Sequence, residues 1–420
     1  MKVEIKQETL LKAIEKGGIA ALSEEAQSDV SNFALLIKSL KINFGTNFSV
    51  ESCTNLMASR YFVEAKEENG ISVSEEGSAF VPAKELMDWV KIQGKDTVIK
   101  MVFNKLDTPQ LLGVDQEEDN EMTSSIKKLG DLKIGSKDEN NTSVKWELDS
   151  YDPDQFPSVD FTEKGDKLFD MYTQHLMDGF GKTSFSIMKK DAQHLYDNVS
   201  IQCHDDDVYM IGTDKKRCAL YKIPLVEDLQ SKDPILVQGS LVSVITKIVE
   251  KDQKLTIHHD SGKGRVFFSL PDMEIRLICP DEAIVKKYPP IEMLKSKKYH
   301  KMATISHQAL SKILYTAALV NDASALFEFV EADDALKVKA ISENGKYKPS
   351  LTKTKLDSVD RGSKAVWIVR HLSECLKSVK QDNVTFSIPD DPIVKSMQLT
   401  WDGDDTFTYL TMATSNPKYI

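Results

Sequence analysis

The feature that most constrains how this chain can fold is an internal repeat. One pattern occurs three times: apolar residues alternate, then recur at a spacing of three and four residues, and then alternate again. This switch of period predicts a strand, a helix and a second strand in each copy. A repeat of this kind decides the architecture of the whole chain. The helices of the three copies are predicted at 82–93, 238–251 and 369–382.

A second helical pattern also occurs three times, once ahead of each copy of the first. Its helices are predicted at 5–17, 172–191 and 306–322, and Ser306 is a suitable N-cap for the last. Corresponding helices are separated by domain-sized lengths of chain. We therefore predict an α+β fold of three repeated domains, each with two helices packed on antiparallel sheets. The predicted domain bounds are 1–165, 166–290 and 291–420.

The first copy is enlarged by a segment at 104–141, which contains an acidic run at 115–121. This segment is dotted with glycines and only weakly periodic, which is typical of a solvated loop or hairpin. We interpret it as a tolerated surface insertion. A docking surface for a dedicated partner is the alternative interpretation.

Composition places the chain among water-soluble globular proteins, with 41% hydrophobic and 28% charged residues. No apolar run approaches the roughly 18 residues that cross a bilayer, and the N-terminus alternates like a strand rather than resembling a signal peptide. The five cysteines are widely spaced and form no C-x-x-C pair, which predicts neither a zinc site nor a disulfide framework. We therefore expect a cytoplasmic protein without a metal or other cofactor.

The net charge of −11 argues against a chain that is basic over its whole surface. The six predicted helices nevertheless carry a net positive charge, and helices of one repeated layer can face one ligand. A lysine-lined surface without base-reading groups attracts DNA of any sequence, although solvated helix faces would show the same pattern. The candidate DNA-facing residues are Lys182, Lys189, Lys190, Lys247, Lys251 and Lys377.

Two segments suggest enzymatic chemistry without completing its motif. The segment 179–184 ends like a phosphate-binding loop, but the position of that motif's first glycine is Leu176. His258, His259 and Asp260 could hold a metal, yet they precede a Ser-Gly turn and fit a hairpin tip as well. A metal-dependent nucleic-acid-processing enzyme that uses these three ligands is therefore the alternative from another functional class.

A family resemblance follows from several short motifs. The segment 212–220, GTDKKRCAL, precedes Ile223-Pro224 in the predicted second domain. Other motifs are YPPI at 288–291, FPSV at 156–159 and VPAK at 81–84, with the first eleven residues and YLTM at 409–412. In this order and spacing they resemble the bacterial β sliding clamps, the β subunits of DNA polymerase III, as a divergent member of that family.

The resemblance implies a DNA clamp fold and a function without catalysis. Two chains would join head to tail into a ring with helices inside and sheets outside. A head-to-tail contact forms a ring when the rotation that relates neighbouring chains returns to the first chain after a whole number of copies. Such a ring acts as a processivity factor in DNA replication: it encircles duplex DNA and tethers the replicative polymerase, the clamp loader and other partners. By resemblance, the residues at the dimer contact would be Trp89, Phe156, Leu319 and Val320.

The resemblance also implies an apolar cleft that binds a short linear peptide of each partner. Thr213 and Arg217 would offer polar contacts at its rim, and an ordinary interdomain core is the alternative interpretation. The residues that would line the cleft are Tyr196, Thr213, Arg217, Cys218, Pro289, Leu294, Leu410 and Met412.

Several positions depart from the family pattern. Cys218 and Ala413 stand where larger apolar residues or proline are common, and Lys215 stands where glycine is common. Glu24 and Glu25 occupy a loop in which many relatives carry an arginine that contacts DNA. Divergence of this breadth suits a phage- or plasmid-encoded clamp. A clamp-like adaptor that binds peptides but no longer closes a ring is a further alternative.

Overall fold

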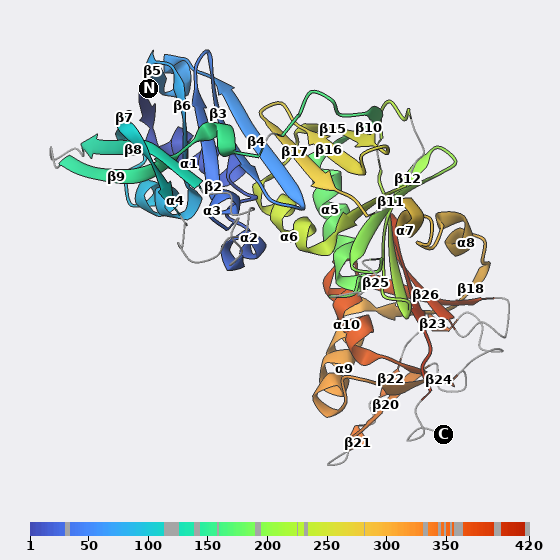
Figure 1. Cartoon of the computed structure of the whole chain (residues 1–420). Coiled ribbons are helices and arrows are strands. Elements are labelled where there is room, and N and C mark those ends of the chain that lie inside the picture. The colour runs from blue at the N-terminus through green and yellow to red at the C-terminus, as the bar shows by residue number, and fades with distance from the viewer. Residues whose placement is uncertain are drawn as a thin grey trace, which may run out of the picture. The chain divides into compact units, whose positions relative to one another are not determined.

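The computed structural model describes most of the chain and divides it into two compact units (Figure 1). Unit 1 comprises Met1–Lys167 and Lys247–Cys279, and unit 2 comprises Leu168–Thr246 and Pro280–Ile420. The residues described are 1–29, 34–112, 126–137, 143–157, 159–189, 195–224, 226–230, 234–280, 282–330, 335–342, 346–347, 350–352, 355–356, 364–389 and 396–415.

Unit 1 is built on one antiparallel sheet with the order β15-β16-β17-β4-β3-β2-β6-β9-β8-β7-β1-β5. Its helices are α1 (Gln7–Gly17), α2 (Glu24–Ser28), α3 (Ala34–Ile37) and α4 (Ala83–Lys91). Its strands are β1 (Lys2–Lys6), β2 (Ser39–Phe44), β3 (Asn47–Cys53), β4 (Met57–Glu64), β5 (Ile71–Glu75), β6 (Gly77–Pro82), β7 (Val98–Leu112), β8 (Ile126–Lys137), β9 (Ser143–Tyr151), β15 (Lys254–Asp260), β16 (Arg265–Ser269) and β17 (Met273–Ile278).

Helix α1 shows how the sheet of unit 1 holds its helices. The spacing of Leu10, Ala13 and Ile14 places all three on one face, which is fully buried in the core. The carbonyl of the last helical residue, Gly17, accepts hydrogen bonds from the hydroxyls of Ser52 and Ser59 at 2.7 and 2.8 Å. These two bonds satisfy a helix-end carbonyl that has no partner within the helix.

Within unit 1, strands β4 and β17 pair although more than 200 residues separate them, with Ala58 opposite Arg276. The segment that follows β9 covers this junction. Phe156 and Phe161 are buried there in an apolar cluster, and the Arg60 guanidinium lies 4.6 Å from the Phe161 ring centroid. The β4–β17 junction is therefore closed by the chain itself.

Unit 2 contains two further antiparallel sheets, ordered β14-β11-β12-β13-β27-β26-β25-β18-β23 and β21-β20-β19-β24, with β22 paired to β20. Its helices are α5 (Thr173–Thr183), α6 (Gly239–Ile248), α7 (Glu282–Val285), α8 (Ile291–Lys295), α9 (His307–Val320) and α10 (Val369–Lys377). Its strands are β10 (Asp166–Tyr172), β11 (Asn198–His204), β12 (Asp207–Thr213), β13 (Arg217–Lys222), β14 (Ile235–Gln238), β18 (Tyr299–Ser306), β19 (Ala325–Val330), β20 (Ala335–Ile341), β21 (Lys346–Tyr347), β22 (Ser350–Thr352), β23 (Lys355–Leu356), β24 (Lys364–Trp367), β25 (Asn383–Pro389), β26 (Ser396–Trp401) and β27 (Asp404–Met412).

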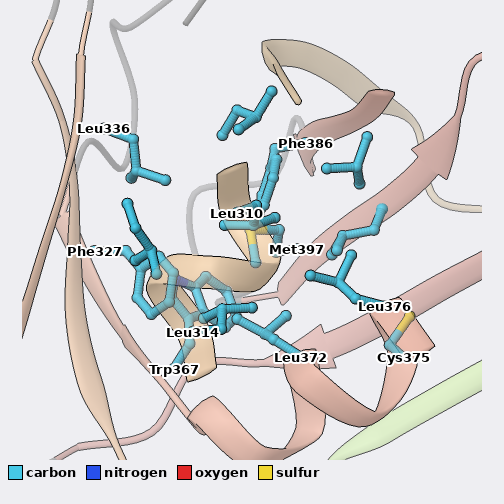
Figure 2. Close-up of a cluster of buried hydrophobic side chains, with 14 of the residues drawn as sticks. Leu310, Leu314, Phe327, Leu336, Trp367, Leu372, Cys375, Leu376, Phe386 and Met397 are labelled. Carbon is cyan, nitrogen blue, oxygen red and sulfur yellow. The ribbon is translucent and has the colours of Figure 1, made fainter. Parts of the chain in front are cut away.

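One large core of unit 2 lies where α9 and α10 pack together against its sheets (Figure 2). Leu310 and Leu314 of α9 meet Leu372 and Leu376 of α10, and all four side chains are buried. The hydroxyl of Ser306 accepts a hydrogen bond from the third residue of α9, as an N-cap does. The apolar spacing of the two helices therefore forms the core that it predicts.

All six predicted helices are present, and the predicted α+β fold is confirmed. The largest difference in length is at 172–191, where α5 ends at Thr183. The helices predicted at 238–251 and 369–382 also end early, at Ile248 and Lys377. A single 3-10 turn follows, and the backbone of Ile187 is extended, so the helix does not reach Lys189. The domain boundaries near 165 and 290 remain predictions.

The described parts of the segment 104–141 lie on two paired strands. Strand β7 continues to Leu112 and β8 begins at Ile126, and these two residues face each other across the ladder. The register shifts between Lys105 and Gln110, which marks an irregularity in the pairing. These strands form a hairpin, but Leu132 and Ile134 of β8 are buried in the core of unit 1 rather than solvated. The acidic run 115–121 lies outside the described residues, and the interpretation of the segment as an insertion remains a prediction.

Among the helices that the structure describes, none is long and apolar enough to cross a membrane. The five cysteines are all free thiols.

One of the two glycines in the phosphate-loop-like segment has a packing role. The whole segment up to Thr183 is helical, so it forms no loop around a phosphate. A Cβ atom added to Gly179 would lie 2.1 Å from the Met210 sulfur and 2.9 Å from the Tyr221 ring, whereas one added to Gly181 would meet no atom within 4 Å. Gly179 therefore permits the close approach of α5 to β12 and β13.

We predict opposite effects for two alanine substitutions in α5. Gly179→Ala should lower the free energy of unfolding by about 1–3 kcal/mol, because the new methyl group overpacks the contact with Met210 and Tyr221. Gly181→Ala, two residues along the same helix, should raise it by about 0.5–1 kcal/mol because alanine favours a helix. Urea unfolding measures both, and equal effects of the two substitutions would contradict this account.

Lys182, also on α5, is held by an ion pair rather than exposed to solvent. Its ammonium lies 2.8 Å from the Asp404 carboxylate and within 6 Å of the ring centroids of Tyr221 and Phe407. Burial opposes ionisation of Asp404, but hydrogen bonds from Lys182 and Thr406 outweigh it and lower the pKa of the carboxyl. The pair ties α5 to the start of β27.

We predict that Asp404→Asn destabilises the protein by about 1–3 kcal/mol at pH 7, because it leaves a half-buried ammonium without its counter-charge. The pKa of Asp404 is lowered by folding, so the carboxylate stabilises the fold above its unfolded pKa of about 4 and loses this effect as the pH falls further. The difference between the melting temperatures of the variant and the wild type should therefore become smaller below about pH 4. Asp405→Asn, at the exposed neighbouring position, is the control and should have little effect.

Candidate functional site

The predicted cleft residues come together where β13 pairs with β27. Cys218 lies opposite Leu410, and Arg217 opposite Thr411. The pairing continues past the end of the strands, since the backbone N–H of Met412 donates to the carbonyl of Lys216 at 2.8 Å. The ladder thus places the 212–220 motif beside the last described strand of the chain.

The YPPI segment is fixed beneath this junction by hydrogen bonds. The buried Tyr288 hydroxyl donates to the carbonyl of Ile211 at 3.0 Å. The side chain of Gln202 binds the segment twice: its Nε2 donates to the Pro289 carbonyl at 3.1 Å, and its Oε1 accepts from the Ile291 N–H at 2.8 Å. These bonds position Pro289 and begin helix α8.

One apolar cluster unites four of the predicted cleft residues. Cys218 is buried in it, whereas Tyr196, Leu294 and Leu410 are half-buried at its edge. Met412 extends the apolar surface, with 40% of its area exposed. The structure therefore brings together apolar side chains from β13, β27, α8 and the segment before β11, on a surface that solvent reaches.

The turn before β13 shows how lysine is accommodated at position 215, where glycine is common in the family. This residue has a φ of 75°, a left-handed conformation that favours glycine. The Asp214 carboxylate accepts from the N–H groups of Lys216 and Arg217, both at 3.0 Å, and so stabilises the turn without glycine. The Lys215 ammonium lies 4.6 Å from the ring centroid of Tyr196, and the substitution therefore adds a cation at the edge of the apolar cluster.

Thr213 and Arg217 are buried rather than free at the rim. The Thr213 hydroxyl donates to the Arg217 carbonyl at 2.6 Å. The Arg217 guanidinium, 7% exposed, donates to Asp214 at 2.9 Å and to Glu374 of α10 at 2.5 Å. The polar contacts that we expected from these side chains are therefore already used within the chain. Arg217 instead joins β13 to α10.

Of the predicted DNA-facing lysines, four have exposed side chains. The structure corrects the interpretation of Lys182, whose ammonium is engaged by Asp404. The sequence could not reveal that pair, because its two members are 222 positions apart. Lys190 lies outside the described residues. The exposed lysines are Lys189, Lys247, Lys251 and Lys377.

The predicted dimer residues fall into two classes. Leu319 is 71% exposed on α9 and Val320 is half-buried beside it, so both offer apolar surface. Trp89 and Phe156 are only 8% and 7% exposed and belong to the cores of unit 1. Their assignment to the contact is therefore corrected, because they leave almost no surface for another chain.

Exposed apolar residues near Trp89 were missed by the sequence prediction. Ile92 at the end of α4 is 75% exposed, and Val144 on β9 is also exposed. Trp146 of β9 stacks on Trp89, with ring centroids 6.4 Å apart. The apolar alternation at 144, 146 and 148 signals this strand, but only the fold shows that one end of it is open to solvent.

The metal-site alternative gains no support from the described residues. His258, His259 and Asp260 are consecutive on β15, so neighbouring side chains alternate between the two faces of the sheet. Within the described part of the chain, no group of three or more His, Cys, Asp or Glu side chains could hold a metal ion. The segment forms the end of a hairpin with β16.

Comparisons with known proteins agree with this geometry. No protein-family model matches the chain. It is 20% identical over 298 residues to the β sliding clamp of Staphylococcus aureus strain Mu50, which covers 68% of this chain and 76% of that protein. The DNA polymerase III β subunit of Pseudomonas aeruginosa superposes with a TM-score of 0.78 at 15% identity, covering 99% of this chain and 100% of that one.

Other solved structures give the same result. The sliding clamp of Bacillus subtilis superposes with a TM-score of 0.77 at 13% identity, over 99% of both chains. The β subunit of Thermotoga maritima superposes with a TM-score of 0.75 at 15% identity, also over 99% of both. The chain therefore has the fold of the bacterial β sliding clamps, and the resemblance to that family predicted from its sequence is confirmed.

Proposed function

We propose that this chain is a DNA sliding clamp, a processivity factor that encircles duplex DNA and tethers a replicative polymerase, a clamp loader and other partners. The observation that carries this proposal is the structural match over 99% of the chain to polymerase III β subunits. The protein would act in the cytoplasm and without catalysis. Its work would consist of binding DNA by enclosure and partners by contact.

The charge pattern supports sequence-independent DNA binding. Lys247 in the last turn of α6, Lys251 in the turn after it, Lys377 at the end of α10 and Lys189 after α5 are exposed cations on or directly after helices of the repeat. They contribute long-range attraction to phosphates but no specific reading of bases. We therefore expect weak direct affinity, and retention that depends on a closed ring.

Ring closure would use the exposed apolar surface around Leu319 and Val320 of one chain. In the other chain, the exposed Ile92 and Val144 near Trp89 are the corresponding candidates. An interface of this kind is heterologous, because the two chains contribute different surfaces. It forms a closed dimer only if the rotation that relates the two chains, applied twice, returns to the first chain. Charged substitutions at the contact should weaken the association of the two chains by about 3–5 kcal/mol, because they place an unpaired charge in a desolvated interface.

We predict that the loaded protein stays on nicked circular DNA and leaves the same DNA after linearisation, because enclosure prevents escape only when the DNA has no end. Gel filtration of protein–DNA mixtures, before and after restriction cutting, measures the difference. The double variant Leu319→Asp/Val320→Asp should be monomeric and should not be retained on either form.

Two results would contradict the ring. Equal retention of the wild type on circular and linear DNA would show that binding is by contact alone. A wild type that is strictly monomeric at micromolar concentration would support the adaptor alternative instead. Cleavage of the DNA on addition of a divalent metal would favour the nuclease alternative.

We also propose that the apolar surface at the β13–β27 junction binds partner peptides. Leu410, Leu294 and Cys218 would hold apolar anchors such as Leu or Phe, and the flexible Met412 would adapt to their shape. A five- to six-residue peptide that buries a few such anchors should bind with a dissociation constant in roughly the micromolar range. This corresponds to a favourable binding free energy of about 8 kcal/mol.

We predict that Met412→Asp abolishes this peptide binding, because it places a carboxylate where an apolar anchor is buried. Dimerisation and retention on circular DNA should be unchanged, since they use other residues. Met412→Leu is the matched control and should bind nearly as well as the wild type. Fluorescence anisotropy with a labelled polymerase-derived peptide measures the affinity. Tight binding by Met412→Asp would place the partner site elsewhere.

A further inference from the structure

Two neighbouring lysines on α1 are both held by carboxylates. Lys12 and Lys16 are four residues apart, so their side chains occupy adjacent positions on one side of the helix. The Lys12 ammonium lies 3.0 Å from the Glu250 carboxylate. The Lys16 ammonium lies 3.0 Å from the same carboxylate and 2.9 Å from that of Asp272. These four residues, all in unit 1, are called the α1 charge cluster, and their formal charges cancel.

The two lysines of the α1 charge cluster differ in exposure. The Lys16 side chain is 6% exposed, and its ammonium also lies 5.6 Å from the ring centroid of Tyr61, so it offers almost no surface to a ligand. The Lys12 side chain is 42% exposed and the Glu250 side chain 50%. A negatively charged ligand can therefore reach Lys12, but it meets Glu250 at the same place.

The pair of Lys12 and Glu250 is ionised at neutral pH. Hydrogen bonds from Lys16, and next from Lys12, lower the pKa of the Glu250 carboxyl. Burial opposes the charge of the Lys12 ammonium, but the hydrogen bond with Glu250 outweighs burial and raises the pKa of the ammonium. Lys12 therefore has its counter-charge in place before any ligand arrives.

Glu250 lies among the candidate DNA-facing cations. It follows the end of α6 by two residues, and Lys247 and Lys251, on either side of it in the sequence, are both exposed. Lys12 belongs to α1, another helix of the repeat. A duplex that approaches these lysines would therefore also meet the Glu250 carboxylate.

A cation that already holds a carboxylate gains little from a phosphate. Binding to DNA is favourable chiefly because cations that neutralise phosphates release the counterions of the DNA. Lys12 would have to exchange Glu250 for a phosphate, and the displaced carboxylate would then repel the phosphates around it. The exchange leaves the number of ion pairs of Lys12 unchanged, so it adds little affinity.

Pairing of this kind recurs in unit 2. The ammonium of Lys182 on α5 lies 2.8 Å from Asp404. On α10, the guanidinium of Arg370 lies 3.9 Å from Glu374, which is one turn further along the same helix. Basic residues on three helices of the repeat are thus paired with carboxylates of the same chain.

We propose that Glu250 takes the place of a DNA phosphate at Lys12 and so limits how strongly the helices of the repeat hold DNA. This inference rests on the proposed sliding-clamp function. A ring that moves along DNA must attract the duplex without fixing it in one position, because each ion pair with a phosphate has to break before the ring advances. The pair of Lys12 and Glu250 prevents one such contact.

The test measures direct binding of the full-length protein to a short linear duplex, which can enter a closed ring from its end. Fluorescence anisotropy with labelled duplex gives the affinity as a function of salt. Glu250→Gln should bind about tenfold more tightly than the wild type at about 50 mM salt and about threefold more tightly at about 200 mM. The reason is that one added phosphate contact steepens the log–log salt dependence by about 0.9.

Two further variants show whether the gain depends on Lys12. Lys12→Gln/Glu250→Gln should return to nearly the affinity and salt dependence of the wild type, since the ammonium that Glu250→Gln releases is then absent. Glu15→Gln removes an exposed carboxylate from the same helix and is the control for the change in net charge. It should bind nearly as the wild type does, because Glu15 does not belong to the α1 charge cluster.

Lys12→Gln alone keeps the proposal testable if the loss of Glu250 weakens the fold. Lys12 is already paired, so its removal should change the salt dependence little. Lys247→Gln should instead reduce the slope by about one, as expected for a cation that contacts a phosphate. An equal reduction in the two variants would show that Lys12 contacts DNA in the wild type, and the proposal would be wrong.

The outcomes separate this inference from the function on which it rests. If Glu250→Gln lowers the melting temperature but binds DNA no more tightly, Glu250 is only a structural partner of α1 and the proposal fails. Equal gains in Glu250→Gln and Glu15→Gln would also overturn it, because net charge would then explain both. A wild type that shows neither salt-dependent affinity for the duplex nor retention on circular DNA would overturn the clamp function together with this inference.

Discussion

The structure depends above all on backbone pairing between strands that are distant in sequence. Strand β13 pairs with β27 almost 200 residues later, with Cys218 opposite Leu410, and this ladder joins two parts of the chain into one sheet. Because side chains alternate along a strand, a slip of one residue would turn the apolar set to the other face. The apolar surface beside Tyr288 exists only in this register, and so do the buried contacts of Arg217 with α10.

Buried polar groups fix this register more sharply than apolar packing alone could. Gln202 binds both sides of the Pro289–Pro290 turn, and the Arg217 guanidinium is shared between Asp214 and Glu374. Each of these bonds has a direction, and an unsatisfied partner in the interior would cost about 1–3 kcal/mol. The apolar cluster provides the larger share of the stabilisation, whereas the polar groups determine which arrangement of the strands is adopted.

Much of the fold could be predicted from the sequence, because repeated helices with strong apolar periods leave a local signal. The end of α5 was missed, since no glycine or proline marks the turn after Thr183. Errors at the site came from long-range pairing: Lys182 has the polar position of a DNA contact, but its partner Asp404 is 222 positions away. An apolar residue such as Phe156 can fill a core or an interface, and only its burial distinguishes the two.

The two long-range junctions differ in one respect that affects how many partners a chain can hold. At the β4–β17 junction, Phe161 lies under the Arg60 guanidinium and fills the apolar surface from within the same chain. At the β13–β27 junction, Leu294, Leu410 and Met412 keep part of their surface exposed. Repeated domains would by themselves suggest repeated docking sites, but an occluded junction reduces the valency. A chain built in this way keeps exposed apolar surface at one of these two junctions, so the partners proposed to bind there would compete for it.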